Sequence, residues 1–103
     1  MIRCSQCGKR LDGEGANGVI ASICAEIMGD EYVDSYYFCE KCSVYTLGVY
    51  HDRFLNEDEV LTRGPLSKAE GDQKVSLIRQ CPESWDKKCR CPAHRAYFGG
   101  SLD

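Results

Sequence analysis

Eight cysteines and two histidines are the side chains of this 103-residue chain whose types and spacing could do chemistry. Seven of the cysteines and one histidine fall into two groups, one spread over the first 42 residues and one confined to residues 81–94. Thiolates and neutral imidazoles are the ligands that zinc and iron take from proteins. The first hypothesis is therefore metal binding at two places.

The first group consists of two Cys-x-x-Cys pairs, Cys4 with Cys7 and Cys39 with Cys42. Two cysteines at this spacing can direct both sulfurs at one tetrahedral ion, because the backbone turns between them. One pair alone would also be compatible with a dithiol redox centre, but that interpretation leaves the second pair unexplained. The two pairs together predict a four-thiolate site for zinc, with a four-sulfur iron site as the alternative.

The segments "CSQCGKRL" and "YYFCEKCSVY" resemble the zinc ribbon, a small fold in which two knuckles grip one zinc and the second knuckle leads into a hairpin. The resemblance covers roughly the first 50 residues at the level of the motif. It implies a structural metal held by Cys4, Cys7, Cys39 and Cys42. It implies no single activity, because zinc ribbons serve many partners.

The second group, in "CPESWDKKCRCPAH", offers three thiols and one imidazole: Cys81, Cys89, Cys91 and His94. These four residues make a complete tetrahedral set, so a second zinc is predicted. Cys24 and then His51 are the substitutes if His94 is not a ligand, although packing in the core is the better interpretation of Cys24. Iron or an iron–sulfur cluster is the alternative cofactor at this site, and Cys81 and Cys91 each precede proline, as the last cysteine of the bacterial ferredoxin run does.

The composition explains why such a chain would need metal. Leu, Ile, Val and Phe supply only 21 of the 103 residues, so apolar burial alone offsets little chain entropy. The amino terminus goes directly into a cysteine pair without a secretory pattern, and no apolar run is long enough to cross a bilayer. We therefore expect a cytoplasmic protein without a membrane partner, in which metal explains the cysteines better than disulfides.

The predicted fold is small α+β and metal-stabilised. Residues 18–28 carry apolar side chains at helical spacing and predict a helix, with a buried strand as the alternative. Two strands flank the second knuckle, in "YVDSYYFCEKC" and "SVYTLGVYHDRFL", and form a hairpin. The acidic connector "NEDEVLTRGP" separates a zinc-ribbon-like lobe, residues 1–55, from a helical lobe, residues 56–103, whose helix starts at a capping box of Ser67 and Glu70 and ends near Gln80. The two lobes could also form one compact domain.

The formal charge of −3 gives no general attraction to nucleic acids, but one basic patch lies among the ligands of the second group. It consists of Lys87, Lys88, Arg90 and Arg95. Its simplest role is to offset thiolate charge, and the alternative is contact with a partner. Trp85, Tyr97 and Phe98 are expected to pack around the second site.

Neither ligand set leaves an open position, and no phosphate-binding loop or deaminase motif is present, so we expect no enzymatic activity. The predicted function is a two-site zinc protein whose structural metals support binding to a macromolecule, with another protein as the expected partner. Two alternatives stay open: an iron protein for electron transfer or redox sensing, and a nucleic-acid-binding protein that uses the basic patch.

Overall fold

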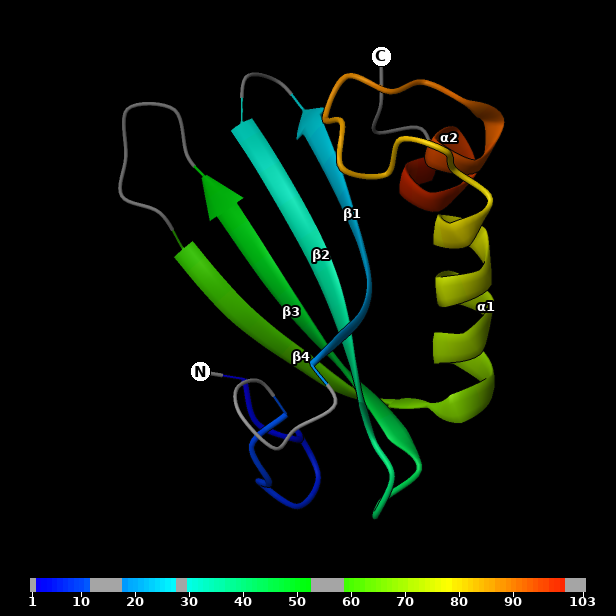
Figure 1. The fold of residues 1–103 in the computed structure, drawn as a ribbon. Helices are drawn as coiled ribbons and strands as arrows, with labels where there is room; N and C mark the ends of the chain where they lie inside the picture. Colours follow the sequence, from blue (N-terminus) through cyan, green and yellow to red (C-terminus); the bar gives the residue numbers. More distant parts are fainter. Residues whose placement is uncertain (1, 12–17, 28–29, 53–58, 100–103) are drawn as a thin grey trace.

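The computed structural model describes residues 2–11, 18–27, 30–52 and 59–99. Four strands form one antiparallel sheet in the order of the chain: β1 (Val19–Ile27), β2 (Asp30–Cys39), β3 (Val44–Asp52) and β4 (Glu59–Ser67). Two helices follow, α1 (Lys68–Arg79) and α2 (Pro92–Phe98) (Figure 1). The predicted α+β class is confirmed.

The hairpin around the second knuckle is confirmed, because β2 and β3 pair from Glu31 with Asp52 down to Cys39 with Val44. The turn between these strands contains Cys42. The strands are rich in aromatic and β-branched residues, which fit a pleated, half-buried surface. The hairpin therefore delivers two of the cysteines to one end of the sheet.

The helix predicted over residues 18–28 is wrong where the structure describes it, because Val19–Ile27 is strand β1. Its apolar residues fit both periods: Ile23 and Ala25 are fully buried on one face, and Ser22, Cys24 and Glu26 alternate with them. Val and Ile are stiff at χ1 and favour strands. Pairing with β2 therefore outweighs the helical spacing, although Ala21, Ala25 and Glu26 favour a helix by themselves.

The predicted connector over residues 56–65 is also wrong in its second part, since residues from Glu59 onward form β4 and pair with β3. Residues 56–58 lie outside the described residues. The acidic composition of this segment did not suggest a strand. β4 lies at the edge of the sheet, so it forms strand-to-strand hydrogen bonds on one side only. Residues of both predicted lobes, 1–55 and 56–103, share this sheet and one core.

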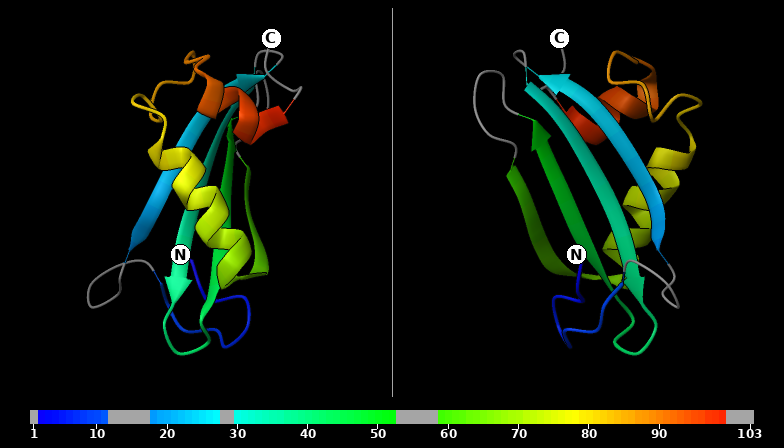
Figure 2. Two further views of the ribbon diagram at one scale, coloured as in Figure 1. Left: turned by 90° about the vertical axis from the view of Figure 1, so that its right-hand side faces the viewer. Right: turned by 60° about the vertical axis from the view of Figure 1, so that its left-hand side comes forward.

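The predicted start of α1 is confirmed, because the Ser67 hydroxyl accepts a hydrogen bond of 3.1 Å from the amide of Glu70. The helix then crosses one face of the sheet and buries Val75 and Ile78 against Ile23, Tyr36 and Tyr45. Helix α2, which the sequence did not predict, lies on the same face near the far end of β1 and β2 (Figure 2). The other face carries the N-terminal segment, residues 2–11, at the end of the sheet where the β2–β3 turn lies (Figure 1).

Neither of the helices in the described part of the chain is long and apolar enough to cross a membrane.

Candidate metal centres

Site 1 consists of Cys4, Cys7, Cys39 and Cys42, which the structure brings together as the spacing predicted. Cys4 and Cys7 come from a turn in the N-terminal segment, and Cys39 and Cys42 come from the end of β2 and the turn after it. The four sulfurs lie within 4.8 Å of one another, and Cys7 Sγ is 3.8 Å from Cys39 Sγ. A single ion can therefore reach all four.

Both turns of site 1 have knuckle geometry. The amides of Gln6 and Cys7 point at Cys4 Sγ, at 3.4 and 3.5 Å, so they stabilise negative charge on that sulfur. Burial alone would raise the pKa of the Cys4 thiol, but the hydrogen bonds from the amides of Cys7 and Gln6 lower it to about 6. Gly8 and Ser43, one residue after each pair, have positive φ angles of 79° and 55°. The first turn is thus shaped to present thiolate at Cys4, whereas burial, and then the neighbouring thiols, raise the pKa of Cys42 in the second turn to about 12.

The N-terminal segment holds site 1 against the sheet. The Ser5 amide donates a 3.0 Å hydrogen bond to the hydroxyl of Thr46, a β3 residue with 0% exposure. Ile2, Cys4 and Leu11 form a second small core with Cys39. Because this core contains fewer apolar side chains than the one beneath α1, a metal at site 1 would carry much of its stability.

Site 2 consists of Cys81, Cys89, Cys91 and His94, at the opposite end of α1. Cys81 follows α1, Cys91 caps the start of α2, and His94 lies in its first turn. Cys81 Sγ is 3.6 Å from Cys89 Sγ, 3.3 Å from Cys91 Sγ and 3.4 Å from His94 Nδ1. The predicted set therefore converges on one point.

The ring orientation of His94 is fixed from outside the cluster. Its Nε2 lies 2.6 Å from the carbonyl oxygen of Cys24 in β1, and the side chain has 0% exposure. A carbonyl oxygen only accepts, so Nε2 must carry the proton and donate it. In the neutral ring, Nδ1 then has a lone pair on the side of the thiols, which is the tautomer that a metal needs.

The distances can be tested against the geometry of a bound ion. With bonds of about 2.3 Å to sulfur and about 2.0 Å to nitrogen, a tetrahedral ion places sulfurs about 3.8 Å apart and a sulfur and nitrogen about 3.5 Å apart. One separation at site 1 and three at site 2, from 3.3 to 3.8 Å, are close to these edges, and all the donor atoms of each site lie within 4.8 Å of one another. They are far longer than the bond of about 2.05 Å in a disulfide, and all eight cysteines are free. Both donor sets therefore fit a tetrahedral metal, and zinc and iron satisfy the distances equally.

Neither substitute ligand joins site 2. Cys24 contributes its backbone carbonyl to His94, and its side chain is not part of the cluster. His51 lies near the end of β3, stacks on Tyr32 at 4.2 Å and pairs through Nε2 with Asp30 at 2.9 Å. Because neither Cys24 Sγ nor the His51 ring lies in the cluster, the four predicted residues are the ones that the fold brings together at site 2.

The basic residues around site 2 are largely engaged within the protein. Lys87 bridges Glu26 and Glu31 on the first two strands, and these carboxylates raise its pKa. Arg90 donates to the carbonyls of Lys87 and Cys89, and Arg95 donates to the carbonyl of Arg90. These contacts favour the structural role of the patch, while a role in partner contact stays a prediction. Lys88 is exposed.

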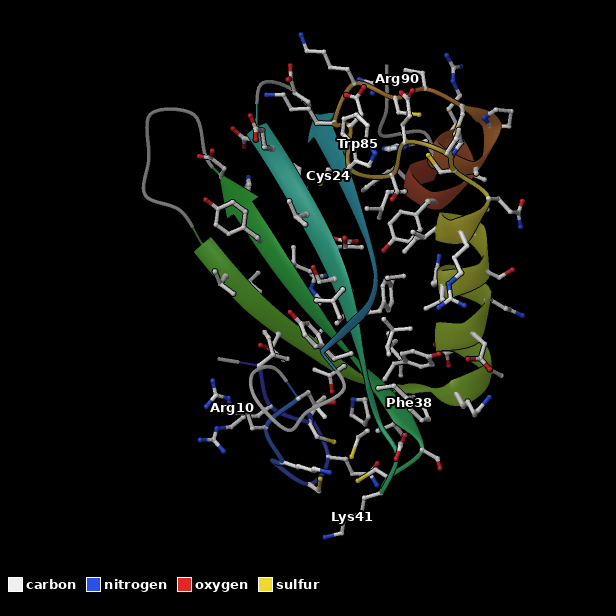
Figure 3. The ribbon with its side chains drawn as sticks, in the orientation of Figure 1. Arg10, Cys24, Phe38, Lys41, Trp85 and Arg90 are labelled. Carbon is white, nitrogen blue, oxygen red and sulfur yellow. The ribbon has the colours of Figure 1, made fainter. Side chains whose placement is uncertain are left out.

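The aromatic residues near site 2 divide into two kinds. Phe98 stacks on the His94 ring with 5.5 Å between centroids, and Tyr97 donates to Asp34 on β2 at 2.7 Å. Trp85 was expected to pack as well, but 72% of its surface is exposed. Figure 3 labels it on the loop that passes β1. A short loop crossing the β1 edge has no deep core in which to bury an indole, so this expectation is wrong.

Comparison of the chain with protein-family models, with curated proteins and with solved structures found no match. The description of both sites therefore rests on the residues themselves.

Proposed function

We propose that the chain is a two-site zinc protein whose metals are structural and whose work is to bind another protein. The observation that carries the zinc proposal is the convergence of four thiol or imidazole donor atoms to within 4.8 Å of one another at each site. At both sites four protein ligands fill the coordination sphere, which is typical of structural rather than catalytic zinc.

The zinc-ribbon likeness supports this proposal at site 1. The knuckle of Cys39 and Cys42 lies in the turn of the β2–β3 hairpin, and the knuckle of Cys4 and Cys7 faces it. At site 2, a structural metal would likewise stabilise the C-terminal half, where a loop of irregular backbone has few apolar contacts. Metal binding would supply the folding free energy that such a loop lacks.

The proposal of a protein partner rests on Trp85. The Trp85 side chain is 72% exposed, whereas Trp side chains are highly buried on average. Trp is also enriched among the residues that contribute most of the binding energy at protein interfaces. Site 2 would fix the loop that bears Trp85, because Cys81 and Cys89 stand on either side of it. A rigid loop loses less entropy when it binds.

The metal proposal is tested by native mass spectrometry and elemental analysis of anaerobically purified protein. We expect two zinc ions per chain and no visible absorption. Iron, or a chromophore that dithionite bleaches, would contradict structural zinc and favour electron transfer or redox sensing.

The partner proposal is tested by replacing Trp85 with the photo-crosslinking residue p-benzoylphenylalanine in cells. The control carries the same group at Lys68, which is exposed on α1. We expect one protein to be crosslinked reproducibly from position 85 and not from position 68. Equal crosslinking from both positions would contradict a binding role for this loop, and crosslinks to RNA or DNA would favour nucleic-acid binding.

A further inference from the structure

Helix α2 carries two of the four donor residues of site 2, although it is only seven residues long. Cys91 caps its start, and His94 lies in its first turn. An isolated helix of this length is not stable in water, so α2 depends on contacts with the rest of the fold. These contacts therefore decide where two of the site 2 donors lie.

Two hydrogen bonds attach one face of α2 to strands β1 and β2. His94 Nε2 lies 2.6 Å from the carbonyl oxygen of Cys24, and the Tyr97 hydroxyl donates to Asp34 Oδ2 at 2.7 Å. Side chains three residues apart, such as His94 and Tyr97, share one face of a helix. Their acceptors are neighbours as well, because Cys24 pairs with Val33, the residue before Asp34. Tyr97 therefore fixes α2 at a second point, one turn beyond the donor His94.

The carboxylate of Asp34 is built into a small polar network between the sheet and the helices. Burial raises the pKa of Asp34, whereas the hydrogen bond from Tyr97 and then the charges of Arg63 and Lys74 lower it. The Tyr36 hydroxyl lies 2.5 Å from the Tyr97 hydroxyl, and it donates there because the one proton of Tyr97 goes to Asp34. Lys74 Nζ lies 5.3 Å from the centroid of the Tyr97 ring. A partly buried carboxylate is costly unless it is bonded in this way, so the network holds Tyr97 firmly.

We propose that Asp34 and Tyr97 are positioning residues for site 2, whose hydrogen bond sets where α2 lies and thereby how tightly the site holds its metal. This inference rests on the proposed metal at site 2. Neither side chain belongs to the group of donors, so the effect passes through the helix. Groups that orient metal ligands from outside the coordination sphere typically change metal affinity when they are replaced. The coupling is reciprocal, so a metal at site 2 also strengthens the contact between Asp34 and Tyr97.

A purely structural role for this pair is the competing explanation, and the fold offers a matched control for it. The Tyr45 hydroxyl on β3 donates to Asp72 on α1, also at 2.7 Å. Tyr45→Phe and Tyr97→Phe therefore remove the same chemical group and the same kind of bond. Only the second bond joins α2 to the sheet.

The experiment is cadmium NMR of the full-length chain with cadmium in place of zinc, titrated with a chelator. The two sites give separate signals because the cadmium shift depends on the number of bound thiolates, four at site 1 and three at site 2. We expect Tyr97→Phe to weaken binding at site 2 about tenfold, the effect of one hydrogen bond to a charged group, and to leave site 1 unchanged. Tyr45→Phe should leave both affinities unchanged. Circular dichroism establishes that each variant is folded.

Variants of Asp34 test the same contact from the other side. Asp34→Asn keeps an oxygen that accepts from Tyr97, so it should hold cadmium at site 2 more tightly than Asp34→Ala. Combining Asp34→Ala with Tyr97→Phe should weaken site 2 little more than either change alone, because both remove one bond.

Stability gives a second readout that a purely structural role would not move. Tyr97→Phe should lower the urea midpoint of the metal-loaded chain more than that of the Cys89→Ser chain, whose site 2 lacks a ligand.

Four results overturn the proposal. These are unchanged affinity of site 2 in Tyr97→Phe, equal weakening by Tyr97→Phe and Tyr45→Phe, Asp34→Asn no tighter than Asp34→Ala, or equal shifts of the urea midpoint in the two backgrounds. If the unsubstituted chain binds neither zinc nor cadmium at site 2, the proposed function and this inference are both wrong. That result is distinct, since it is seen before any residue is replaced.

Discussion

The Nε2 atom of His94 lies 2.6 Å from the carbonyl oxygen of Cys24, and this contact joins site 2 to the edge strand β1. Two further hydrogen bonds run between the same parts, from the amide of Cys24 to Ser84 and from the amide of Glu26 to Lys87. An exposed strand edge invites pairing with other chains. The loop that carries the site 2 residues therefore covers a strand edge as well as bringing together a group that could hold a metal.

His94→Ala should abolish metal binding at site 2 and leave one ion per chain at site 1. The variant removes the Nδ1 donor and the contact with Cys24 together. Cys24→Ser is the matched control, because it alters a side chain outside the cluster and keeps the carbonyl that His94 needs. Native mass spectrometry should count one zinc for the first variant and two for the second. One zinc in Cys24→Ser would show that Cys24 is the true ligand.

Cys89→Ser should release the β1 edge without unfolding the sheet. If site 2 holds a metal as proposed, its loss would free the loop whose carbonyls accept hydrogen bonds from the amides of Cys24 and Glu26. We expect faster hydrogen exchange at these two amides, measured by NMR, and unchanged exchange in the β2–β3 pair. Cys42→Ser, which removes a ligand of site 1 instead, should leave the exchange of Cys24 and Glu26 slow. Equal acceleration in both variants would mean that the sites are not independent.

The sequence predicted the two groups of donors because site 2 lies within 14 residues, site 1 consists of two closely spaced Cys-x-x-Cys pairs, and the chemistry of these donors is restrictive. To predict that Cys39 and Cys42 lie together, it was enough to recognise the two strands and the turn between them. The cap at Ser67 was predictable for the same reason, since it involves residues three apart. Local patterns of this kind require little knowledge of the rest of the fold.

Features that depend on distant partners were not predictable. The strand character of Val19–Ile27 comes from pairing with β2, and β4 comes from pairing with β3, in segments whose own composition pointed elsewhere. The contact of His94 with Cys24 spans 70 residues. No sequence pattern in either segment predicts this contact, because its acceptor is a backbone carbonyl, which every residue has.

Tyr45→Phe should make stability less sensitive to alkaline pH. Burial, and then the hydrogen bond of 2.7 Å from Tyr45 to Asp72, raises the pKa of this phenol from 10.0 to about 12. A raised pKa means that the folded state favours the neutral phenol, so the stabilisation is complete below pH 10 and is lost as pH rises toward 12. The variant should lose about 1 kcal/mol at neutral pH, the typical net value of one hydrogen bond.

The measurement for Tyr45 is urea unfolding of both proteins with zinc present, at several pH values from about 8 to about 11, below the shifted pKa. Tyr36 and Tyr97 also have raised pKa values, but they are common to both proteins, so the difference in slope isolates Tyr45. Parallel stability curves would contradict the assignment.

Gly71→Ala should destabilise the protein, although the same change in an exposed helix usually stabilises it by about 1 kcal/mol. A β-carbon built at Gly71 would lie 1.9 Å from Cδ2 of the Tyr45 ring, which is itself buried in the core. Either α1 moves away from β3 or the ring leaves its position, and overpacking of this kind costs about 1–3 kcal/mol. Ser76→Ala is the control, since Ser76 is exposed on the same helix and should gain a few tenths of a kcal/mol, about the difference in helix propensity. Urea unfolding of the zinc-loaded variants measures both, and a Gly71→Ala protein more stable than the original would show that α1 does not pack this closely on Tyr45.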